Sequence, residues 1–154
     1  MPEQTKIEPL SATEYDIIEK ALWELVKQYP KEPGDPDVEV RYGELDAGTS
    51  VAVAANGGRY TGRDIIGGFT AEVNFSVAYK SSPRNSPQRI NAQAFVGRIM
   101  RWLESTKDLP LLTGGRTITK ITASGTYDGG TTQDKSTIYA ADAVMEYRKK
   151  GVSN

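Results

Sequence analysis

The residues best suited to chemistry lie in the glycine-rich stretch GGRYTGRD, residues 57–64. Its spacing is close to the phosphate-binding pattern G-x-x-x-x-G-K-[ST], in which the lysine reaches the phosphates and the hydroxyl binds magnesium. Arg63 takes the lysine position and Asp64 takes the hydroxyl position, where a carboxylate would meet phosphate as a like charge. The stretch also leads into a strand pattern, so no helix N-terminus faces an anion. We therefore interpret residues 56–68 as a flexible or partner-contacting loop, with nucleotide binding as the alternative.

Acidic residues recur in pairs within turn-like segments. The pairs are Asp35 and Asp37, Glu44 and Asp46, and Asp128 and Asp134. A calcium loop needs a denser set of oxygen ligands and a distal glutamate at a fixed offset, which DGGTTQD (residues 128–134) lacks. Glycoside hydrolysis needs two carboxylates that flank a cleft, which spacing alone does not establish. We interpret the pairs as ordinary turn residues, and weak metal binding or acid–base catalysis as alternatives.

The chain contains no histidine and no cysteine. This composition excludes Ser–His triads, histidine or thiolate metal sites and disulfide bonds. An enzyme would have to work with Asp, Glu, Lys and Tyr, and the candidate groups are then Tyr60, Arg63 and Asp64. We expect no catalytic residue, no metal site and no cofactor. A small ligand-binding or enzyme domain built on carboxylates and tyrosine stays as an alternative function.

A basic cluster precedes and lines the second amphipathic segment. It comprises Arg84, Arg89, Arg98 and Arg101, with Trp102 nearby. The favoured interpretation is a solvated helix face balanced by Glu104 and Asp108; the alternative is an adaptor that binds a partner through Arg98 and Arg101. The formal net charge of −1 gives no basic excess for nucleic acid, and we expect no nucleic-acid sequence recognition. An acidic protein surface would suit such a cluster better.

Length and composition indicate one globular domain over residues 1–154, with residues 1–10 and 151–154 as flexible tails. The 154 residues are 38% apolar and 25% charged, which is enough for a modest core. No stretch approaches the roughly 20 apolar residues that span a membrane, so we expect no membrane partner. The start MPEQTKIEPLSATEY has no apolar run of signal-peptide type, which favours a cytoplasm-like compartment.

Two amphipathic helices are predicted. Residues 11–30 begin with Ser11 followed three residues later by Glu14, the pattern of a capping box, and end at Pro30. Apolar residues then recur at helical spacing; they are Ile17, Ile18, Ala21, Leu22, Leu25 and Val26. The second helix follows the turn SSPRNSPQR, with Ser86 as N-cap and Pro87 at the first helical position. We expect Trp23, Phe75, Phe95 and Trp102 in the core.

Strand patterns occupy residues 38–45, 49–56, 69–81, 116–127 and 135–150, with ELDAG as a hairpin connection and residues 128–134 as a hairpin tip. In the third strand, odd positions from Phe69 to Tyr79 are apolar and predicted to hold the helices. The even positions from Thr70 to Lys80 form a polar face suited to other subunits. The order α-β-β-β-α-β-β predicts an α+β fold: a mostly antiparallel sheet of about five strands with both helices packed on one face.

Three features carry a resemblance. They are the helix ending near LVKQYP, the central run GELDAGTSVAVAANGGRYTGRDIIGGFTAEVNFSVAYKSS followed by INAQAFVGRIMRWLES, and the closing strand YAADAVMEYRKKG. Together, over residues 11–151, they resemble the minor capsid and tail terminator proteins of tailed phages, as carried by prophages of Gram-positive bacteria. The resemblance covers the order of elements and includes no catalytic signature.

The resemblance implies a structural role. Such proteins assemble as a ring, usually hexameric, on the finished end of the tail tube, stop its growth and face the head connector. The expected partners are copies of the chain, the tail tube protein and head connector proteins, in the virion neck and, during assembly, the host cytoplasm. We expect the glycine-rich segments 56–68 and 128–134 to order on contact. The interface candidates are Arg59, Tyr60, Arg63, Thr70, Glu72, Asn74, Lys80, Asp128 and Asp134. A tail tube subunit is the alternative within this class.

Overall fold

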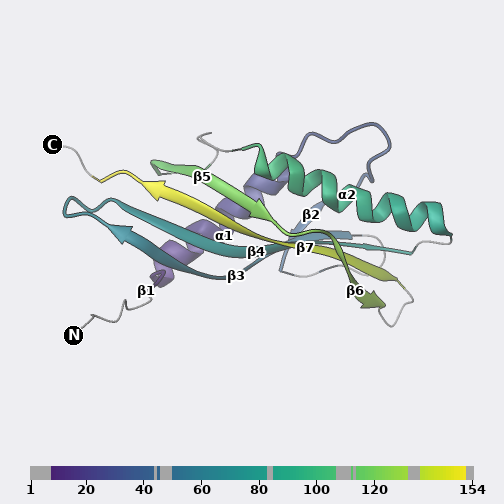
Figure 1. Ribbon diagram of the computed structural model, residues 1–154, viewed down its shortest axis with the longest axis horizontal. Coiled ribbons are helices and arrows are strands. Elements are labelled where there is room, and N and C mark those ends of the chain that lie inside the picture. Colours follow the sequence, from purple (N-terminus) through teal and green to yellow (C-terminus); the bar gives the residue numbers. More distant parts are fainter. Residues whose placement is uncertain are drawn as a thin grey trace.

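The computed structural model describes residues 8–43, 45, 50–82, 85–106, 112, 114–131 and 136–151. Within these ranges the chain folds into two helices and a seven-stranded, mostly antiparallel sheet, which confirms the α+β class (Figure 1). The predicted order of elements is kept, with two short strands added to it: β1 (Glu8–Pro9) and β6 (Tyr127–Thr131). β1 lies in the segment predicted to be a flexible tail, and Leu10 beside it is buried. Residues 8–10 are therefore part of the fold.

Three long antiparallel strands form the centre of the sheet. They are β3 (Ser50–Arg63), β4 (Phe69–Ser81) and β7 (Thr137–Lys149), and the continuous strand order is β1-β3-β4-β7-β5. β5 (Arg116–Ala123) pairs with one half of β7 and β6 pairs with the other half. β4 pairs with β7 along its whole length, from Phe69 opposite Lys149 to Ser81 opposite Thr137. Along the whole β4–β7 pair, odd-numbered residues therefore lie on one face of the sheet and even-numbered residues on the other.

The predicted loop over residues 56–68 is wrong in its first half, because β3 continues to Arg63. The glycines that indicated a loop instead allow a bulged strand, with a register shift between Ala55 and Gly58. Gly57 has a φ of 110°, which disfavours other residues. A side chain at Gly58 would come within 2.8 Å of Leu10 Cδ1, so glycine lets the N-terminal segment pack closely there.

The predicted hairpin through ELDAG is also wrong. β2 (Val40–Tyr42) pairs with β3 in parallel, with Val40 opposite Val51. Its position is fixed by contacts beyond the ladder, because the Trp23 indole Nε1 donates a hydrogen bond of 2.9 Å to the Val40 carbonyl. Alternation of apolar residues identifies a strand but does not give its direction, so the sequence pattern fitted either arrangement.

The outer edge of β3 is covered along much of its length. β2 pairs with its first residues and β1 with Arg59 and Tyr60. Between them, two tyrosine hydroxyls accept hydrogen bonds from the strand, Tyr42 Oη from the Ala55 amide at 3.3 Å and Tyr15 Oη from the Gly57 amide at 3.1 Å. At the other side of the sheet, β5 is the last strand of the order. The two sheet edges therefore differ in how they are protected.

The helices begin at side-chain caps. α1 (Ala12–Lys27) starts after Ser11, whose Oγ accepts a hydrogen bond of 3.1 Å from the Glu14 amide, as predicted. The Glu14 carboxylate does not return to the Ser11 amide, however, and this half of the capping box is replaced by a bond from that amide to Tyr60 Oη. α2 (Ser86–Glu104) is capped by Asn85 rather than the predicted Ser86, since Asn85 Oδ1 accepts from the Gln88 amide at 3.0 Å.

Both helices cover the same face of the sheet. α1 reaches it through Glu14, which bonds to Tyr147 on β7, and α2 through Phe95, whose ring lies 5.0 Å from that of Tyr79 on β4. Odd positions 71–79 of β4 and 139–147 of β7 are buried beneath the helices, as the alternation predicts. Phe75 and Phe95 are buried core residues, whereas Trp23 and Trp102 are only partly buried at its margin.

Candidate interaction surfaces

The opposite face of the sheet carries the even positions of β4 and their neighbours, and in the described part of the chain no helix packs on it. Thr70 and Asn74 are exposed on this open face, and Glu72, Ser76 and Ala78 are half-buried. A strand of 13 residues extends over roughly 40 Å at about 3.4 Å per residue, so the open face is long. Its size and polarity make it a surface suited to contact with protein, and its middle has a shallow recess of about 530 Å³ that Asn74, Thr122 and Asp142 help to line.

A row of charged side chains crosses the open face at right angles to the strands. Arg59 of β3 and Glu72 of β4 form an ion pair with 2.6 Å between Nε and Oε1. Glu72 stands opposite Glu146 of β7, and Glu146 opposite Lys120 of β5. Two adjacent carboxylates would repel each other, and the cation at each end of the row offsets this. The row runs from a cation through two carboxylates to a second cation, and a partner of the open face must match this order of charges.

The structure brings together four of the predicted interface residues and separates the others. Arg59, Thr70, Glu72 and Asn74 lie on the open face. Lys80 was predicted to extend this face, but it is buried with 8% of its surface exposed. Alternation along β4 therefore does not predict which residues are exposed at the end of this strand.

Tyr60 and Arg63 lie on the helix side of the sheet instead of the open face. The Tyr60 ring packs edge-on against Phe69 with 5.1 Å between centroids, and its hydroxyl donates to Ser11 Oγ. The Arg63 guanidinium lies 4.0 Å from the Tyr60 ring and also pairs with Glu8 at 3.0 Å. The bulges of β3 shift its side chains relative to β4, so parity in the sequence did not assign these two residues to a face.

The last two predicted interface residues lie in the segment 128–134. Asp128 is exposed on β6, and its Oδ1 accepts a hydrogen bond of 2.8 Å from the Gly130 amide. Part of the predicted hairpin tip is thus a strand that pairs with β7. Asp134 lies outside the described residues.

The β3–β4 connection forms a compact hairpin tip, residues 63–68. Asp64 Oδ1 accepts hydrogen bonds from the amides of Ile66 at 3.0 Å and Gly68 at 2.7 Å, and the Asp64 amide donates to the Gly68 carbonyl. This turn leaves Ile65 fully exposed and Ile66 with 56% of its surface exposed. Two adjacent branched apolar side chains held outward by a closed turn mark a contact site. The sequence signal was DIIGG between two strand patterns, and it was missed.

Replacing Asp64 by Ala is expected to loosen the hairpin tip while leaving the fold intact. The change removes both acceptor bonds of the turn, which should cost about 1–2 kcal/mol locally. Amide hydrogen exchange at Ile66 and Gly68 should then become faster, with little change at core amides of β4. Thr61→Ala, which removes a hydroxyl bond to Thr70 outside the turn, serves as the control. Unchanged exchange in Asp64→Ala would contradict a turn closed by this carboxylate.

Basic side chains gather around the hairpin tip. Arg63, Arg148, Lys149 and Lys150 line a shallow pocket of about 490 Å³ together with Asp64 and Phe69. Arg148 and Lys150 are exposed, and Lys149 stands opposite Phe69 in the sheet. The end of the sheet thus combines apolar side chains with positive charge.

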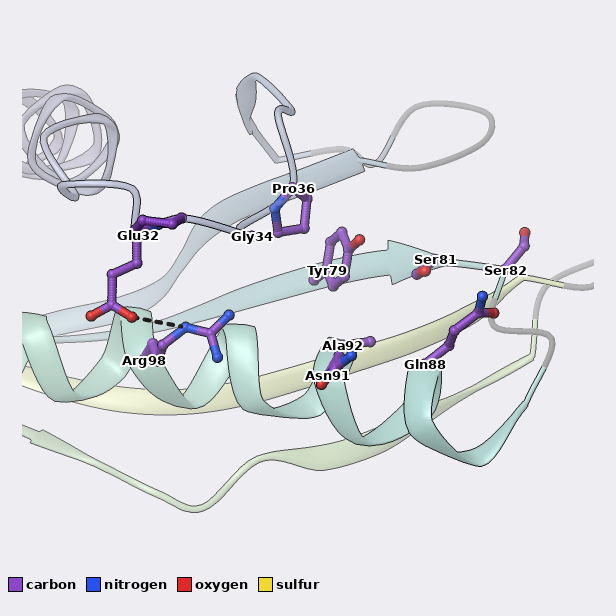
Figure 2. A pocket seen from close by; sticks show the side chains of 11 residues that line it. Glu32, Gly34, Pro36, Tyr79, Ser81, Ser82, Gln88, Asn91, Ala92 and Arg98 are labelled. Atoms are coloured by element: carbon purple, nitrogen blue, oxygen red, sulfur yellow. Dashed lines mark ion pairs between the residues drawn. The ribbon is translucent and has the colours of Figure 1, made fainter.

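A second pocket, the connector pocket, lies between residues 32–36 and α2 and has a volume of about 540 Å³. Figure 2 shows Glu32, Gly34 and Pro36 on one side and Gln88, Asn91 and Ala92 of α2 on the other. Tyr79 and Ser81 at the end of β4 lie between them (Figure 2). One wall of the connector pocket is therefore the irregular segment 32–36, which must be held against α2.

The Asp35 carboxylate holds that segment. Its side chain is only 1% exposed and accepts hydrogen bonds from Arg98 Nε at 3.1 Å, from the Tyr29 hydroxyl at 2.8 Å and from the Glu32 amide at 2.7 Å. Burial opposes the charged form, but these three donors outweigh it and hold the pKa of Asp35 below its usual value. Burial, together with the bond to Asp35, raises the pKa of Tyr29 to about 12. The prediction that Asp35 is an ordinary turn residue is therefore wrong.

Arg98 is therefore less available to a partner than an arginine on a solvated helix face would be. Its side chain is 27% exposed and is engaged by Asp35, while Arg101 one turn on is exposed. The two arginines of the adaptor alternative, Arg98 and Arg101, thus have different surroundings.

The candidate groups of the enzyme alternative do not act together. Asp64 accepts hydrogen bonds from backbone amides, and the Tyr60 hydroxyl donates to Ser11. Among the described residues, no three acidic, His or Cys side chains gather as metal ligands would.

A buried ion pair links α1 to the sheet. Glu14 accepts hydrogen bonds from Arg116 Nε at 2.8 Å and from the Tyr147 hydroxyl at 2.9 Å, and the side chains of Glu14 and Arg116 are 7% and 5% exposed. Burial favours the neutral carboxyl, but bonds from Arg116 and Tyr147 prevail and lower the pKa of Glu14. Burial and the bond to Glu14 raise the pKa of Tyr147. The position of α1, and with it the covering of the β3 edge, depends on this group.

Comparison with known proteins adds no assignment. No protein-family model matches the chain, and no curated protein matches it. Among the described residues, neither helix is long and apolar enough to cross a membrane.

Proposed function

We propose that the chain is a structural virion assembly protein of a tailed phage, a tail terminator or head–tail joining component. In this role copies form a hexameric ring that caps the tail tube and connects it to the head. The observation that supports the proposal most is the one-sided sheet, whose helix-free face is long and polar. The similarity of element order to such proteins, described above, gives the specific role.

Three surfaces of different character fit a ring subunit, which must contact two neighbours, a tube and a connector. The open face offers a polar row of charges, the hairpin tip offers apolar and basic side chains, and the connector pocket offers a polar recess lined by both Glu32 and Arg98. They lie on different sides of the molecule and can be occupied together. Polar, charge-matched surfaces favour specific and reversible assembly over indiscriminate association.

Electron microscopy of the purified chain mixed with tail tubes that lack their terminator tests the proposal. We expect a ring of density at one end of each tube and no further tube growth when tube protein is added. Asn74→Lys places a new positive charge on the open face and should weaken capping about tenfold or more, because an unmatched charge in an interface is costly. Gln93→Lys on the exposed side of α2 carries the same charge change and should cap normally.

A tail tube subunit remains the alternative, because stacked copies would need the same polar open face for their contacts. A tube subunit stacks without limit. Continuous filaments of the purified chain, with no preference for tube ends, would therefore support that function. A chain that neither caps tubes nor forms rings or filaments would contradict both.

A further inference from the structure

The hairpin tip carries two adjacent apolar side chains at one end of the molecule. Among the described residues, the exposed large apolar side chains are Ile65, Ile66, Ile90 and Tyr127. Isolated exposed side chains of this kind are ordinary on protein surfaces, whereas a neighbouring pair at a projecting end marks a contact site. Figure 1 shows the β3–β4 hairpin at one end of the long axis and the beginning of α2, where Ile90 lies, at the other.

The tip is already formed before any partner arrives. Asp64 Oδ1 accepts hydrogen bonds from the amides of Ile66 and Gly68, which closes the turn. The chain after β7 also packs beside the turn, because a side chain at Gly151 would come within 2.6 Å of Ile66 Cγ1. In this arrangement Ile65 is fully exposed and Ile66 is 56% exposed. Little conformational entropy is therefore lost when the tip enters an apolar environment.

Positive charge surrounds the tip on both faces of the sheet. The cations next to the turn, which we call the tip cations, are Arg63, Arg148, Lys149 and Lys150. Arg148 stands opposite Thr70 on the open face, whereas Lys149 stands opposite Phe69 on the helix side. Phe69 is also the ladder partner of Arg63, so the last row of the sheet has a cation on each side of this ring. The apolar pair lies beyond this row, at the apex of the hairpin.

Few carboxylates offset the tip cations. Glu8 pairs with Arg63 at 3.0 Å, and the Asp64 carboxylate accepts hydrogen bonds from the amides of the turn. Within the residues that the structure describes, the other three tip cations form no ion pair. Arg148 and Lys150 are exposed, so their charges act at the surface. The tip therefore has an excess of positive charge, and a complementary partner is negatively charged at the level of these cations.

The arrangement favours a lipid surface over other anionic partners. A membrane presents negative head groups above an apolar layer, which matches a row of cations behind an apolar apex. A membrane also reaches the cations of both sheet faces at once, because the hairpin meets it end on. Nucleic acid offers phosphates but no apolar layer for the two isoleucines. A protein docked against one face of the sheet would leave the cations of the other face unmatched.

We propose that the unassembled chain docks on anionic lipid surfaces through the hairpin tip. Ile65 and Ile66 enter the boundary between head groups and acyl chains, and the tip cations contact lipid phosphates. The expectation of no membrane partner rested on the lack of a spanning segment, and docking on a surface requires none. This inference goes beyond the capping role and does not rest on it, since it concerns the chain before assembly.

Vesicle sedimentation tests the docking with the intact chain. We expect binding to vesicles made of equal parts of phosphatidylcholine and phosphatidylglycerol, little binding to phosphatidylcholine alone, and release as salt is added. Ile65→Asp should lower the partition coefficient about tenfold or more, because a carboxylate replaces an apolar anchor. Ile90→Asp makes the same change on α2 and should have no effect. No binding by the wild-type chain, or an equal loss in both variants, would overturn the proposal.

The tip cations are tested by removing single charges. Arg148→Gln and Lys150→Gln should each lower the partition coefficient about fivefold, which corresponds to one cation near an anionic lipid surface. Arg89→Gln removes an exposed cation at the beginning of α2 and should leave binding unchanged. Equal losses in all three variants would show attraction by total charge alone and would overturn the assigned site.

Insertion of the apex has its own readout, because the chain contains no cysteine. The thiol introduced by Ile65→Cys can carry a dye whose emission shifts to the blue in an apolar environment. Anionic vesicles should shift this emission, and the emission of the same dye on Ile90→Cys should stay unchanged. The absence of a shift in labelled Ile65→Cys would overturn the insertion of the isoleucines, even where the chain sediments with vesicles.

Two soluble polyanions represent the competing partners. Poly-glutamate stands for an acidic protein surface, and a duplex DNA fragment stands for nucleic acid. Neither should remove the chain from vesicles when it is added at the same concentration of negative charge. Displacement by either polyanion would assign the tip to that class of partner and overturn the lipid surface. Tube capping is measured independently, so a failure of vesicle binding would leave the capping role in place.

Discussion

Replacing Arg116 by Met is expected to lower the free energy of unfolding by about 3–5 kcal/mol, because it leaves the buried Glu14 carboxylate without its cation. Arg116 is 5% exposed and donates through Nε to Glu14 Oε2. The Tyr147 hydroxyl would still donate to this carboxylate, but a hydroxyl does not compensate a buried charge. Urea unfolding followed by tryptophan fluorescence measures the loss.

The control is an exposed pair with similar geometry. Arg59→Met breaks the ion pair with Glu72, where the arginine side chain is 46% exposed, and should cost at most about 1 kcal/mol. Replacing both Glu14 by Leu and Arg116 by Met should recover part of the loss, because no buried charge is then left unpaired. A double variant less stable than Arg116→Met would contradict the account.

The buried cluster of Glu14, Arg116 and Tyr147 makes the free energy of unfolding depend on pH in both the acidic and the alkaline range. The pKa of Glu14 is lowered in the folded state, so its contribution is present above the ordinary glutamate value and is lost as the pH falls through the lowered value. The pKa of Tyr147 is raised, so its contribution is complete below the ordinary value of 10.0 and is lost as the pH rises beyond it. In Arg116→Met, where the lowering of the Glu14 pKa is lost, stability should fall less steeply on acidification than in the wild-type chain.

Replacing Asp35 by Ala is expected to lower the free energy of unfolding by about 2–3 kcal/mol, because hydrogen bonds to charged groups are worth more than neutral ones. The change removes the acceptor of Arg98, Tyr29 and the Glu32 amide together. The half-buried Arg98 guanidinium and Tyr29 hydroxyl would then lose this partner, and only the Glu32 carboxylate, 3.7 Å from Arg98 Nε, would remain beside the guanidinium. Urea unfolding measures the global cost, and amide hydrogen exchange over residues 31–37 shows whether the connector detaches from α2.

Asp37→Ala is the matched control, two residues along the same segment. Its carboxylate is fully exposed and reaches only Lys31, at 3.3 Å, so its removal should change stability by at most about 0.5 kcal/mol. Equal stability of the two variants would contradict the role assigned to Asp35.

The sequence predicted those elements whose periodicity extends over many residues. The helix over Ala12–Lys27 has a regular apolar stripe and a serine cap, and β4 alternates from Phe69 to Tyr79. Short elements were missed, since β1 has two residues and β6 is rich in glycine, and neither leaves a periodic pattern. The glycines of residues 57 and 58 indicate a backbone that departs from ideal geometry, which both a loop and a bulged strand satisfy.

Much less of the candidate surfaces was predictable. Alternation in β4 correctly placed Thr70, Glu72 and Asn74 together, because a strand of constant register has one parity on each face. Asp35 and Glu14 could not be recognised as buried, since their partners are 63 and 102 residues away in the chain. A carboxylate in a turn and a carboxylate in a first helical turn are ordinary in sequence. Their roles arise only from tertiary contacts.

The two edges of the sheet differ, and this difference limits how many further copies can join the subunit by strand pairing. On the β3 side, β1, β2 and the hydroxyls of Tyr15 and Tyr42 already satisfy much of the strand, whereas β5 ends the sheet on the other side. Strand addition by another copy is therefore favoured at one edge only. Two copies joined through β5 would leave no second equivalent edge, so edge pairing stops at a pair. Growth beyond two copies must use side-chain surfaces, whose specificity can be set by individual charges.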